Sequence, residues 1–341
     1  MTDLLGLTLN DLKNIVREKG YQGYVATQIS DWLYKKYVTD CMFMTNLSLN
    51  IRKDISGEYY IGAGMPSAVQ VSKDGTKKYL FDVGSTYAVE SAWIPGQGRN
   101  TLCVSSQVGC KMGCRFCMTG KQGFQKNLTS GQIINQIISL PERDTLTNVV
   151  YMGMGEPFDN IDAVLDSLSV LTSEWGFGWS PTRITVSTIG LIPAMERFLS
   201  ESKCHLAISL HSPFDEERRE LMPVQKVYPA KEVIQALKPF DFSGQRRLSF
   251  EYILFGGVND TPEHAKAVAG ILKGLKCRVN LINFHPFEGS GYKPSKTGSV
   301  LAFQEILEKK GIITTIRVSR GMDINAACGM LSTKKAKIKP E

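Results

Sequence analysis

The sequence of 341 residues lacks the features that place a protein in or across a membrane. It contains no run of about twenty apolar residues, which is the length that a helix needs to span a bilayer. It also lacks an apolar N-terminal stretch followed by a small-residue cleavage site, which is the pattern of a secretory signal. We therefore expect a cytoplasmic protein with no membrane partner.

The sequence also lacks a strong excess of one charge. Its 40 Lys and Arg residues against 33 Asp and Glu residues give a formal net charge of +7. The basic residues gather around a cysteine cluster and at the C-terminus: Lys111, Arg115, Lys121, Lys126, Lys334, Lys335, Lys337 and Lys339. A polyanionic partner and a solvated surface with a lysine-rich tail both account for this pattern.

Cysteine, in contrast, is well represented, with eight residues. In a reducing compartment, clustered cysteines favour metal or redox chemistry over a disulfide scaffold. Three of them stand alone among apolar neighbours, and we interpret them as small buried hydrophobic residues: Cys41, Cys204 and Cys277. The other five are the candidates for chemistry: Cys103, Cys110, Cys114, Cys117 and Cys328.

The N-terminal part of the chain shows two different patterns. Residues 8 to about 55 have helical spacing, which predicts a helical accessory domain over residues 1–60. Residues 67–93 alternate as strands do, and "KDGT" at 73–76 reads as a turn between them. We expect a β-hairpin extension over residues 61–95.

From residue 96 the chain alternates between strand-like and helical segments. The strand-like segments are "TLCVSS", "NVVYMG", "RITVST", "HLAISLH", "LSFEYIL" and "RVNLINF", and the helical ones lie near 129–139, 160–173, 191–201, 230–238, 262–274 and 300–309. This alternation predicts an α/β core with a parallel sheet over residues 96–330. Six units are fewer than the eight of a closed barrel, so we expect a partial (β/α)6 TIM-like barrel. A last strand, "TTIRVS", lies within this core, and a basic tail over residues 331–341 follows it.

Polar residues and one cysteine follow the predicted strands, at the end of the barrel where active sites collect. They are Glu156, Ser187, His211, Asn259, His285 and Cys328. The sequence therefore predicts a site built from the ends of several strands.

Cys110, Cys114 and Cys117 form a C-x3-C-x2-C array directly after the first predicted barrel strand. Zinc sites take four protein ligands, so a zinc ion would need a fourth, such as His205 or His211. A [4Fe–4S] cluster held by three cysteines has one iron left open. That iron can be chelated by the amino and carboxylate groups of a methionine-like cofactor.

The array, with Phe116 before its last cysteine, resembles that of the radical S-adenosylmethionine (SAM) superfamily. The motifs "CVSSQVGC", "MGMGEP", "STIG", "SLHSPFDEERRELMP" and "AACG" occur in this order. Together they resemble the RlmN/Cfr family of RNA adenine methyltransferases over nearly the whole chain. The resemblance implies a radical SAM barrel, one [4Fe–4S] cluster on the three cysteines of the array, and two molecules of SAM per turnover.

The resemblance also implies residues that bind SAM. The positions that match are Gly155, Glu156, Ser187, Ser209, Leu210, His211 and His285. His285 departs from the pattern, since the family commonly has Asn in this "N-P-F" turn. Asn325 stands where Asp is common, and we assign it no role.

The chemistry implied by the resemblance uses Cys328, Cys103 and Glu90. Cys328 is methylated, its methyl carbon is activated to a radical, and that carbon adds to adenine to give a covalent RNA adduct. Cys103 then attacks the sulfur of Cys328 in a transient disulfide that releases the methylated base. A buried strand residue is the alternative for Cys103. Glu90 matches the proton acceptor, with an exposed hairpin residue as the alternative.

The substrates implied by the resemblance are 23S rRNA and, as a second one, tRNA, with methylation at C2 of adenosine. The N-terminal helical domain would then bind RNA. The Arg-Gly pair in "VSRGMDINAACG" is typical of the RlmN branch, while Cfr-like methylation at C8 is the alternative. A non-catalytic RNA-binding protein with a structural metal is the alternative of another class. An electron donor such as flavodoxin or ferredoxin is also implied, and we expect a monomer.

Overall fold

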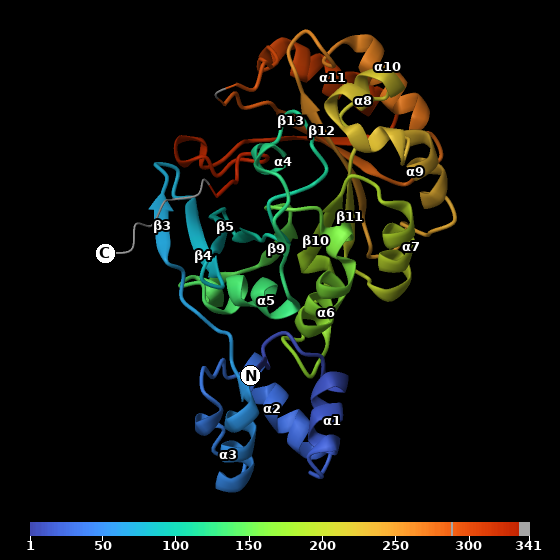
Figure 1. The fold of residues 1–341 in the computed structure, drawn as a ribbon. Helices are drawn as coiled ribbons and strands as arrows, with labels where there is room; N and C mark the ends of the chain where they lie inside the picture. The colour runs from blue at the N-terminus through green and yellow to red at the C-terminus, as the bar shows by residue number, and fades with distance from the viewer. Residues whose placement is uncertain (288, 334–341) are drawn as a thin grey trace.

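The computed structural model describes residues 1–287 and 289–333, so Lys334, Lys335, Lys337 and Lys339 of the predicted tail lie outside the described residues. A small N-terminal unit of helices lies below a larger body in which helices cover a long sheet (Figure 1). None of the helices in the described ranges is both long and apolar enough to cross a membrane.

The N-terminal unit contains three helices, α1 (Leu9–Glu18), α2 (Tyr24–Tyr34) and α3 (Leu49–Glu58). Helix α1 is preceded by Thr8, whose side chain and that of Asp11 cap each other's backbone N–H groups. Two short strands, β1 (Thr2–Asp3) and β2 (Tyr59–Tyr60), pair in parallel and bring the two ends of the unit together.

The larger body is built on one ten-stranded sheet in the order β14-β13-β12-β11-β10-β9-β6-β5-β4-β3. Its strands are β3 (Ala68–Val71), β4 (Lys77–Val83), β5 (Tyr87–Ile94), β6 (Thr101–Cys103), β9 (Asn148–Tyr151), β10 (Ile184–Thr188), β11 (His205–Ser209), β12 (Leu248–Leu254), β13 (Arg278–Asn283) and β14 (Ile313–Arg317). The strands from β6 to β14 are parallel, whereas β3, β4 and β5 continue the sheet in antiparallel fashion. The sheet curves, and its edges β3 and β14 do not pair with each other within the described residues. The predicted α/β fold with a partial barrel is therefore confirmed.

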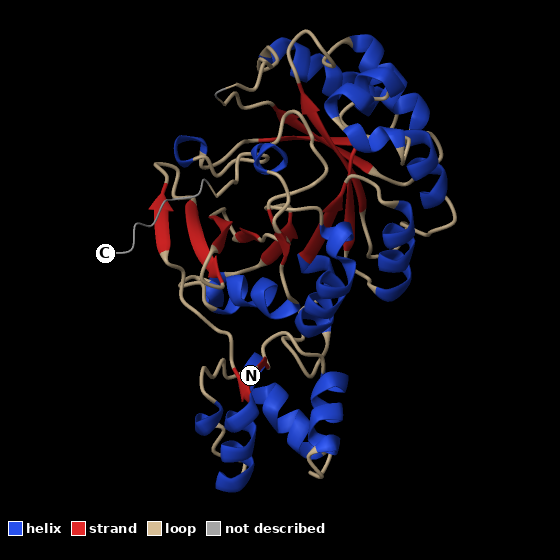
Figure 2. Cartoon of the chain, viewed as in Figure 1, coloured by secondary structure: helices blue, strands red, loops and turns tan. Residues whose placement is uncertain are grey.

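Helices follow the parallel strands and lie outside the curved sheet (Figure 2). They are α5 (Ser130–Ile138), α6 (Ile161–Thr172), α7 (Ile192–Glu201), α8 (Asp215–Leu221), α9 (Ala230–Leu237), α10 (Pro262–Ile271) and α11 (Thr297–Lys309). Between β6 and α5 lie β7 (Gln107–Val108), α4 (Met118–Gln122) and β8 (Lys126–Asn127). Short 3-10 helices are η1 (Cys41–Phe43), η2 (Arg143–Thr145), η3 (Pro157–Asn160), η4 (Pro181–Arg183), η5 (Pro223–Lys226) and η6 (Met322–Ile324).

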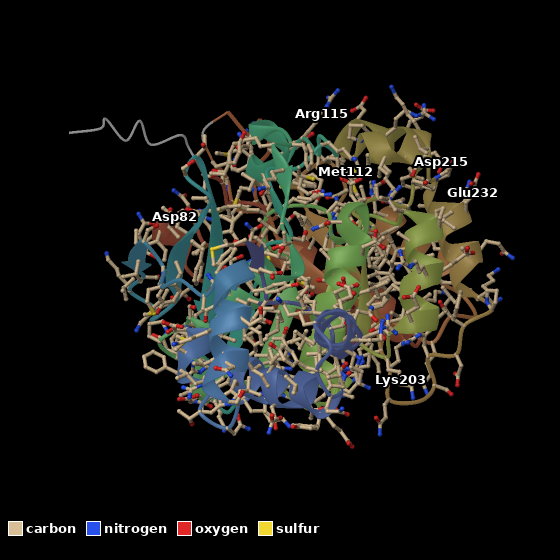
Figure 3. All side chains as sticks on the ribbon, turned by 60° about the horizontal axis from the view of Figure 1, so that its bottom comes forward. Asp82, Met112, Arg115, Lys203, Asp215 and Glu232 are labelled. Carbon is tan, nitrogen blue, oxygen red and sulfur yellow. The ribbon has the colours of Figure 1, made fainter. Side chains whose placement is uncertain are left out.

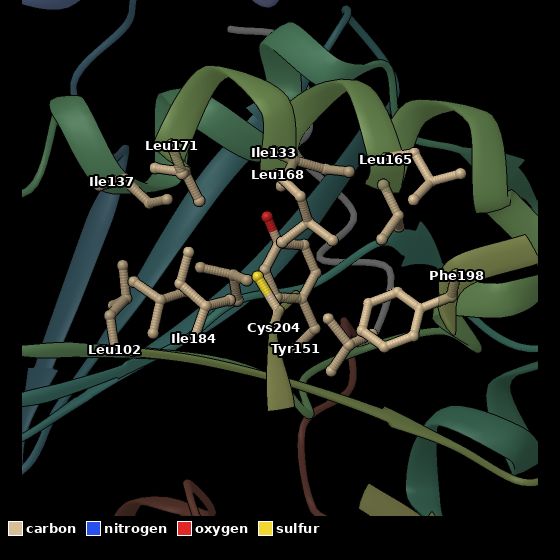
Figure 4. Close-up of a cluster of buried hydrophobic side chains, with 14 of the residues drawn as sticks. Leu102, Ile133, Ile137, Tyr151, Leu165, Leu168, Leu171, Ile184, Phe198 and Cys204 are labelled. Carbon is tan, nitrogen blue, oxygen red and sulfur yellow. The ribbon is translucent and has the colours of Figure 1, made fainter. Parts of the chain in front are cut away.

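The main core lies between the sheet and these helices. Figure 4 shows Leu102 and Ile184 from the sheet facing Ile137, Leu168 and Leu171 from the helices. Cys204 lies buried in this cluster and Cys41 in the N-terminal unit, whereas Cys277 is half-buried. The first two therefore have the packing role predicted for isolated cysteines.

The N-terminal unit packs tightly on helix α5. Gly6 and Gly131 approach so closely that a Cβ added at Gly131 would lie 2.2 Å from the carbonyl oxygen of Leu5. The amide of Asn135 exchanges two hydrogen bonds with the backbone of Gly64, at 2.9 and 3.0 Å. The segment that joins the N-terminal unit to the sheet is thus held against helix α5.

The segment after β14 returns across the barrel opening to the turn between β3 and β4. The carboxylate of Asp74 in this turn accepts a hydrogen bond from Gly321 N at 2.9 Å, and Asp323 accepts one from Lys73 N at 3.1 Å. Figure 1 shows this C-terminal segment, in red, beside β3 and β4. The returning segment, residues 318–333, therefore runs from one edge strand of the open sheet, β14, to the turn beside the other, β3.

Candidate active site

A cavity at the carboxyl ends of the barrel strands collects most of the predicted site residues. Its walls include Cys110, Cys114, Cys117, Gly155, Glu156, Ser187, Ser209, His211 and Cys328. They come from the loop after β6, from the ends of β9, β10 and β11, and from the returning segment. Residues separated by more than 200 positions thus face one space.

The cysteine loop is fixed to its surroundings by backbone hydrogen bonds. Arg115 N donates to the carbonyl of Leu221 at 3.0 Å, and Met118 N donates to that of Gly329 at 2.7 Å. Cys110 and Cys114 are buried, while Cys117 is half-buried at the start of α4. Figure 3 labels Arg115, which is exposed, and Met112, which is half-buried and lines the cavity. The cysteine loop is therefore held in place by the backbone of its neighbours, with Arg115 on its exposed side.

Gly155 is at a position where the fold requires glycine. Its φ is +101°, and an added Cβ would lie 2.6 Å from the Cβ of Gln107. The neighbouring Glu156 N donates to Oε1 of Gln107 at 2.8 Å. This close approach brings the end of β9 against the start of the cysteine loop.

Glu156 is a buried carboxylate that links two strand ends. Its oxygens accept hydrogen bonds from Phe158 N at 3.0 Å and Ile189 N at 3.1 Å. Burial raises the pKa of Glu156 to about 7, although hydrogen bonds to it act in the opposite direction. A carboxylate of this kind gains stability as an anion when a cation, such as an ammonium group, enters the cavity.

His211 is held in one orientation and one protonation state. Its φ of +56° is rare for a residue other than glycine, and its carbonyl accepts a hydrogen bond from the Asn259 amide at 2.7 Å. Ring Nδ1 accepts from Ile253 N at 3.0 Å. Burial, with a smaller effect of Arg218, lowers the pKa of His211 to about 3. The ring is therefore neutral and carries its proton on Nε2, where it can donate.

Cys328 and Cys103 lie together at the inner side of the barrel. Both line a second cavity, and Cys328 also lines the first. Burial, followed by the neighbouring Cys328, raises the pKa of the Cys103 thiol to about 12. Both thiols are free rather than joined in a disulfide.

Besides Cys103, which lines only the second cavity, and Asn259, which bonds to the His211 carbonyl, three predicted site residues do not line the cavity that holds the cysteine array. Leu210 packs in the hydrophobic core, and His285 is half-buried in the loop after β13. Glu90 is buried rather than exposed, but it lines a separate pocket with Lys78, to which it pairs at 3.0 Å. Its other oxygen accepts from Ser332 N at 3.0 Å, so it anchors the returning segment in this structure.

Comparison with known proteins agrees with this geometry. A model of the radical SAM superfamily matches residues 104–268, and one of a ribosomal RNA large subunit methyltransferase N-terminal domain matches residues 2–61. A protein of Parabacteroides distasonis named "Probable dual-specificity RNA methyltransferase RlmN" is 55% identical over 332 residues, covering 97% of each chain. The chain belongs to the RlmN family of radical SAM methyltransferases.

Other RlmN-family and radical SAM proteins extend this agreement. A "Dual-specificity RNA methyltransferase RlmN" of Pelobacter propionicus is 41% identical, covering 98% of this chain and 96% of that one. The crystal structure of a radical SAM methyltransferase from Sphaerobacter thermophilus superimposes with a TM-score of 0.89 at 38% identity, covering 97% and 99% of the two chains. The family and the fold indicated by the motifs are confirmed.

Membership of the RlmN family implies a [4Fe–4S] cluster and SAM, and the three cysteines of the array fit such a cluster. Within residues 1–287 and 289–333, no three His, Cys, Asp or Glu side chains lie close enough to hold a single metal ion. A zinc ion needs four ligands, all about 2.0–2.3 Å from one atom. A cluster takes each thiolate on a different iron and therefore accepts thiols that are farther apart.

Sequence reasoning missed Arg218, which organises this RlmN-family site. Its guanidinium is fully buried and donates to the carbonyls of Ile189, Ser209 and Leu210 at 3.2, 3.3 and 3.1 Å. It therefore joins the ends of β10 and β11 beside Ser209 and His211. The charged pattern "DEERREL" is typical of an exposed helix. The one signal for a buried role was the position of Arg218 shortly before the apolar "LMP".

Proposed function

We propose that this protein methylates C2 of an adenosine in 23S rRNA and of an adenosine in tRNA. We further propose that it acts as a cytoplasmic monomer that receives electrons from a flavodoxin or a ferredoxin. One observation carries the proposal: the cysteine array, Cys328 and four polar residues at strand ends, Glu156, Ser187, Ser209 and His211, line one cavity. The names of the RlmN relatives, which describe dual-specificity RNA methyltransferases, support the choice of substrates.

In this proposal the cofactors are held by the chain's own residues. Cys110, Cys114 and Cys117 bind the [4Fe–4S] cluster as thiolates, and their binding releases protons. Burial raises the pKa of the Cys110 thiol to about 12 and that of Cys114 well above its usual range. Gly155, Glu156, Ser187, Ser209 and His211 contact SAM, with the Glu156 carboxylate accepting from the ammonium group. When bound, cluster and SAM together supply the methyl group and the radical chemistry, and we assign two SAM molecules to each turnover.

Cys328 acts in this proposal as the methyl carrier and Cys103 as the resolving thiol. The bond between the Cys328 sulfur and the carbon attached to adenine breaks as the Cys103 sulfur attacks and a disulfide forms. The Cys103 proton must leave during this step, because a thiol with a pKa of about 12 is protonated near pH 7. The released carbon, which keeps the electron pair of the broken bond, takes up a proton and becomes the methyl group. We retain Glu90 as the acceptor of the adenine proton, which requires its contact with Ser332 to open.

The experiment that tests the proposal is mass spectrometry of nucleosides after anaerobic incubation with SAM, a reductant and either 23S rRNA or tRNA. We expect 2-methyladenosine from both RNAs. 8-Methyladenosine alone would instead support the Cfr-like alternative, and unmodified RNA would refute methylation. Iron analysis of the anaerobic protein should give about four irons per chain. One zinc would instead support a non-catalytic metal protein.

Cys103→Ser should trap a covalent protein–RNA adduct, because serine cannot form the disulfide that releases the base. Denaturing gel electrophoresis with labelled RNA measures the adduct. The control is Cys277→Ser, which removes a half-buried thiol elsewhere. If Cys103→Ser turns over normally with no adduct, Cys103 is not the resolving thiol.

A further inference from the structure

A second cavity, of about 420 Å³, lies at the amino ends of the barrel strands, opposite the cysteine array. Thr185, His205 and Arg278, from the starts of β10, β11 and β13, line it. Cys103 and Cys328 form its inner end. Four described residues line both cavities, namely Met152, Ile282, Cys328 and Leu331, so the two spaces meet at Cys328.

The charged side chains that line this second cavity are basic. No described residue among its walls is Asp or Glu. Five arginines line it, namely Arg99, Arg247, Arg278, Arg317 and Arg320. Arg317 has a carboxylate neighbour, Glu251, at 3.7 Å, while no ion pair is found for the other four within the described part of the chain. Holding like charges together costs free energy, so this arrangement is suited to an anionic ligand.

His205 responds to this positive field. Burial, and then the nearby Arg247 and Arg99, lower the pKa of His205 to about 4. Its Nδ1 accepts from Arg247 N at 3.0 Å, so a neutral ring carries its proton on Nε2. The imidazole therefore adds a hydrogen-bond donor, without adding charge, to the wall between the arginines.

The chemistry of the cavity changes along its depth. On β13, Arg278, Asn280 and Ile282 share one face and span about 13 Å at 3.3 Å per residue. Charged side chains thus lie at the rim, with Arg99 and Arg247 exposed, while Thr185 and Ser249 are uncharged and deeper. Thiols lie at the end. This order matches a nucleotide that enters base first, with its phosphates remaining outside.

We infer that the arginine cluster binds the phosphodiester groups that flank the target adenosine. The base then reaches Cys328 through the second cavity, from the side opposite SAM. This inference rests on the proposed function, since it takes RNA as the substrate. An RNA backbone is favoured over an acidic protein because the cavity reaches Cys328, the thiol to which the proposed reaction attaches RNA.

The test is filter binding of transcribed 23S rRNA to the holoenzyme at 50 and 200 mM KCl. We expect Arg247→Ala/Arg278→Ala to weaken binding by about tenfold and to lower the slope of log affinity against log salt by about 1.4, since single-stranded contacts give about 0.7 each. Arg247→Lys/Arg278→Lys should retain most of this slope because the charges remain. In turnover, KM should rise while kcat stays within about threefold.

The matched control is Arg197→Ala/Arg219→Ala, which removes the same charge from the outer helices α7 and α8. Equal losses in both double variants, or none in either, would overturn the inference. Unchanged RNA affinity with slower reduction by flavodoxin would overturn it in favour of an acidic protein partner. If wild-type enzyme binds RNA but forms no 2-methyladenosine, the proposed function fails while the arginine effect can still be measured.

Discussion

Single buried groups in the first cavity give the protein an uncommon pH response. Glu156 has a pKa of about 7 against 4.5 when unfolded, so its protonation stabilises the folded state as pH falls through this interval. His211, with a pKa of about 3 against 6.5, acts in the opposite direction, because the unfolded chain binds a proton that the folded one does not. His205 acts in the same direction as His211. The effects of the glutamate and the histidines therefore partly cancel between pH 6.5 and 5.

Glu156→Gln should remove the stabilisation that wild type gains from protonation of Glu156 as pH falls. From pH 6.5 to 5.0, we expect the variant to lose about 2 kcal/mol more unfolding free energy than wild type, since 1.36 kcal/mol corresponds to one pKa unit. Anaerobic urea unfolding at the two pH values measures the difference. Exposed Glu174→Gln is the control. Equal losses in Glu156→Gln and wild type would show that Glu156 is ionised throughout this range.

The sequence revealed those site residues that act within a short segment or at the end of a strand. The spacing of Cys110, Cys114 and Cys117 is local, and Glu156 and Ser187 follow apolar runs that mark their strands. Arg218 could not be predicted, because its partners are backbone carbonyls brought near only by folding. For the same reason the sequence did not show that Glu90 pairs with Lys78 and accepts a hydrogen bond from Ser332. It suggested an exposed hairpin position as the alternative to a proton acceptor, whereas the side chain is buried.

At the scale of elements, the turn between β3 and β4 holds the returning segment that carries Cys328. Burial raises the pKa of Asp74, but hydrogen bonds from Gly321 and Thr76 outweigh it and lower the pKa to about 2. The carboxylate therefore stays charged and keeps its contact with Gly321 N at ordinary pH. Alternating residues predicted this hairpin, but not that its turn contacts a segment about 250 residues away.

Asp74→Ala should loosen the returning segment. A hydrogen bond to a charged group contributes about 1.5–3 kcal/mol, so amide exchange in residues 321–330 should rise about tenfold to a hundredfold. Hydrogen–deuterium exchange with mass spectrometry measures this rate. Asp241→Ala, which removes a turn carboxylate bonded to Ser243, is the control. Unchanged exchange would mean that the contacts of Asp323 and α4 hold the segment without Asp74.

At the scale of the whole molecule, the N-terminal unit and the barrel body meet through glycines. The approach of Gly131 to Leu5 leaves no room for a side chain, and Ser30 Oγ donates to the carbonyl of Trp175 at 2.6 Å. Helical spacing predicted the unit, but its position could not be predicted because it depends on close backbone contact rather than on an apolar pattern. The unit is therefore fixed in position on the barrel body.

Gly131→Ala should disturb this interface. A Cβ 2.2 Å from a carbonyl oxygen forces the unit to shift, and we expect unfolding free energy to fall by about 3 kcal/mol. Gly57→Ala, in α3 with open space around it, should change stability by no more than about 1 kcal/mol. Urea unfolding measures both, and small-angle X-ray scattering measures the shift. Equal stability of the two variants would refute the tight interface.

The returning segment spans the gap between the two edges of an open sheet and carries Cys328. A chemical change at this thiol, such as alkylation, attachment to RNA or disulfide formation, should therefore also shift the returning segment, which lies across the barrel opening. If the proposed reaction takes place at Cys328, each of its stages should leave its own pattern of protease cleavage near Arg317 and Arg320. The progress of the reaction could then be followed from the shape of the protein, without observing the RNA.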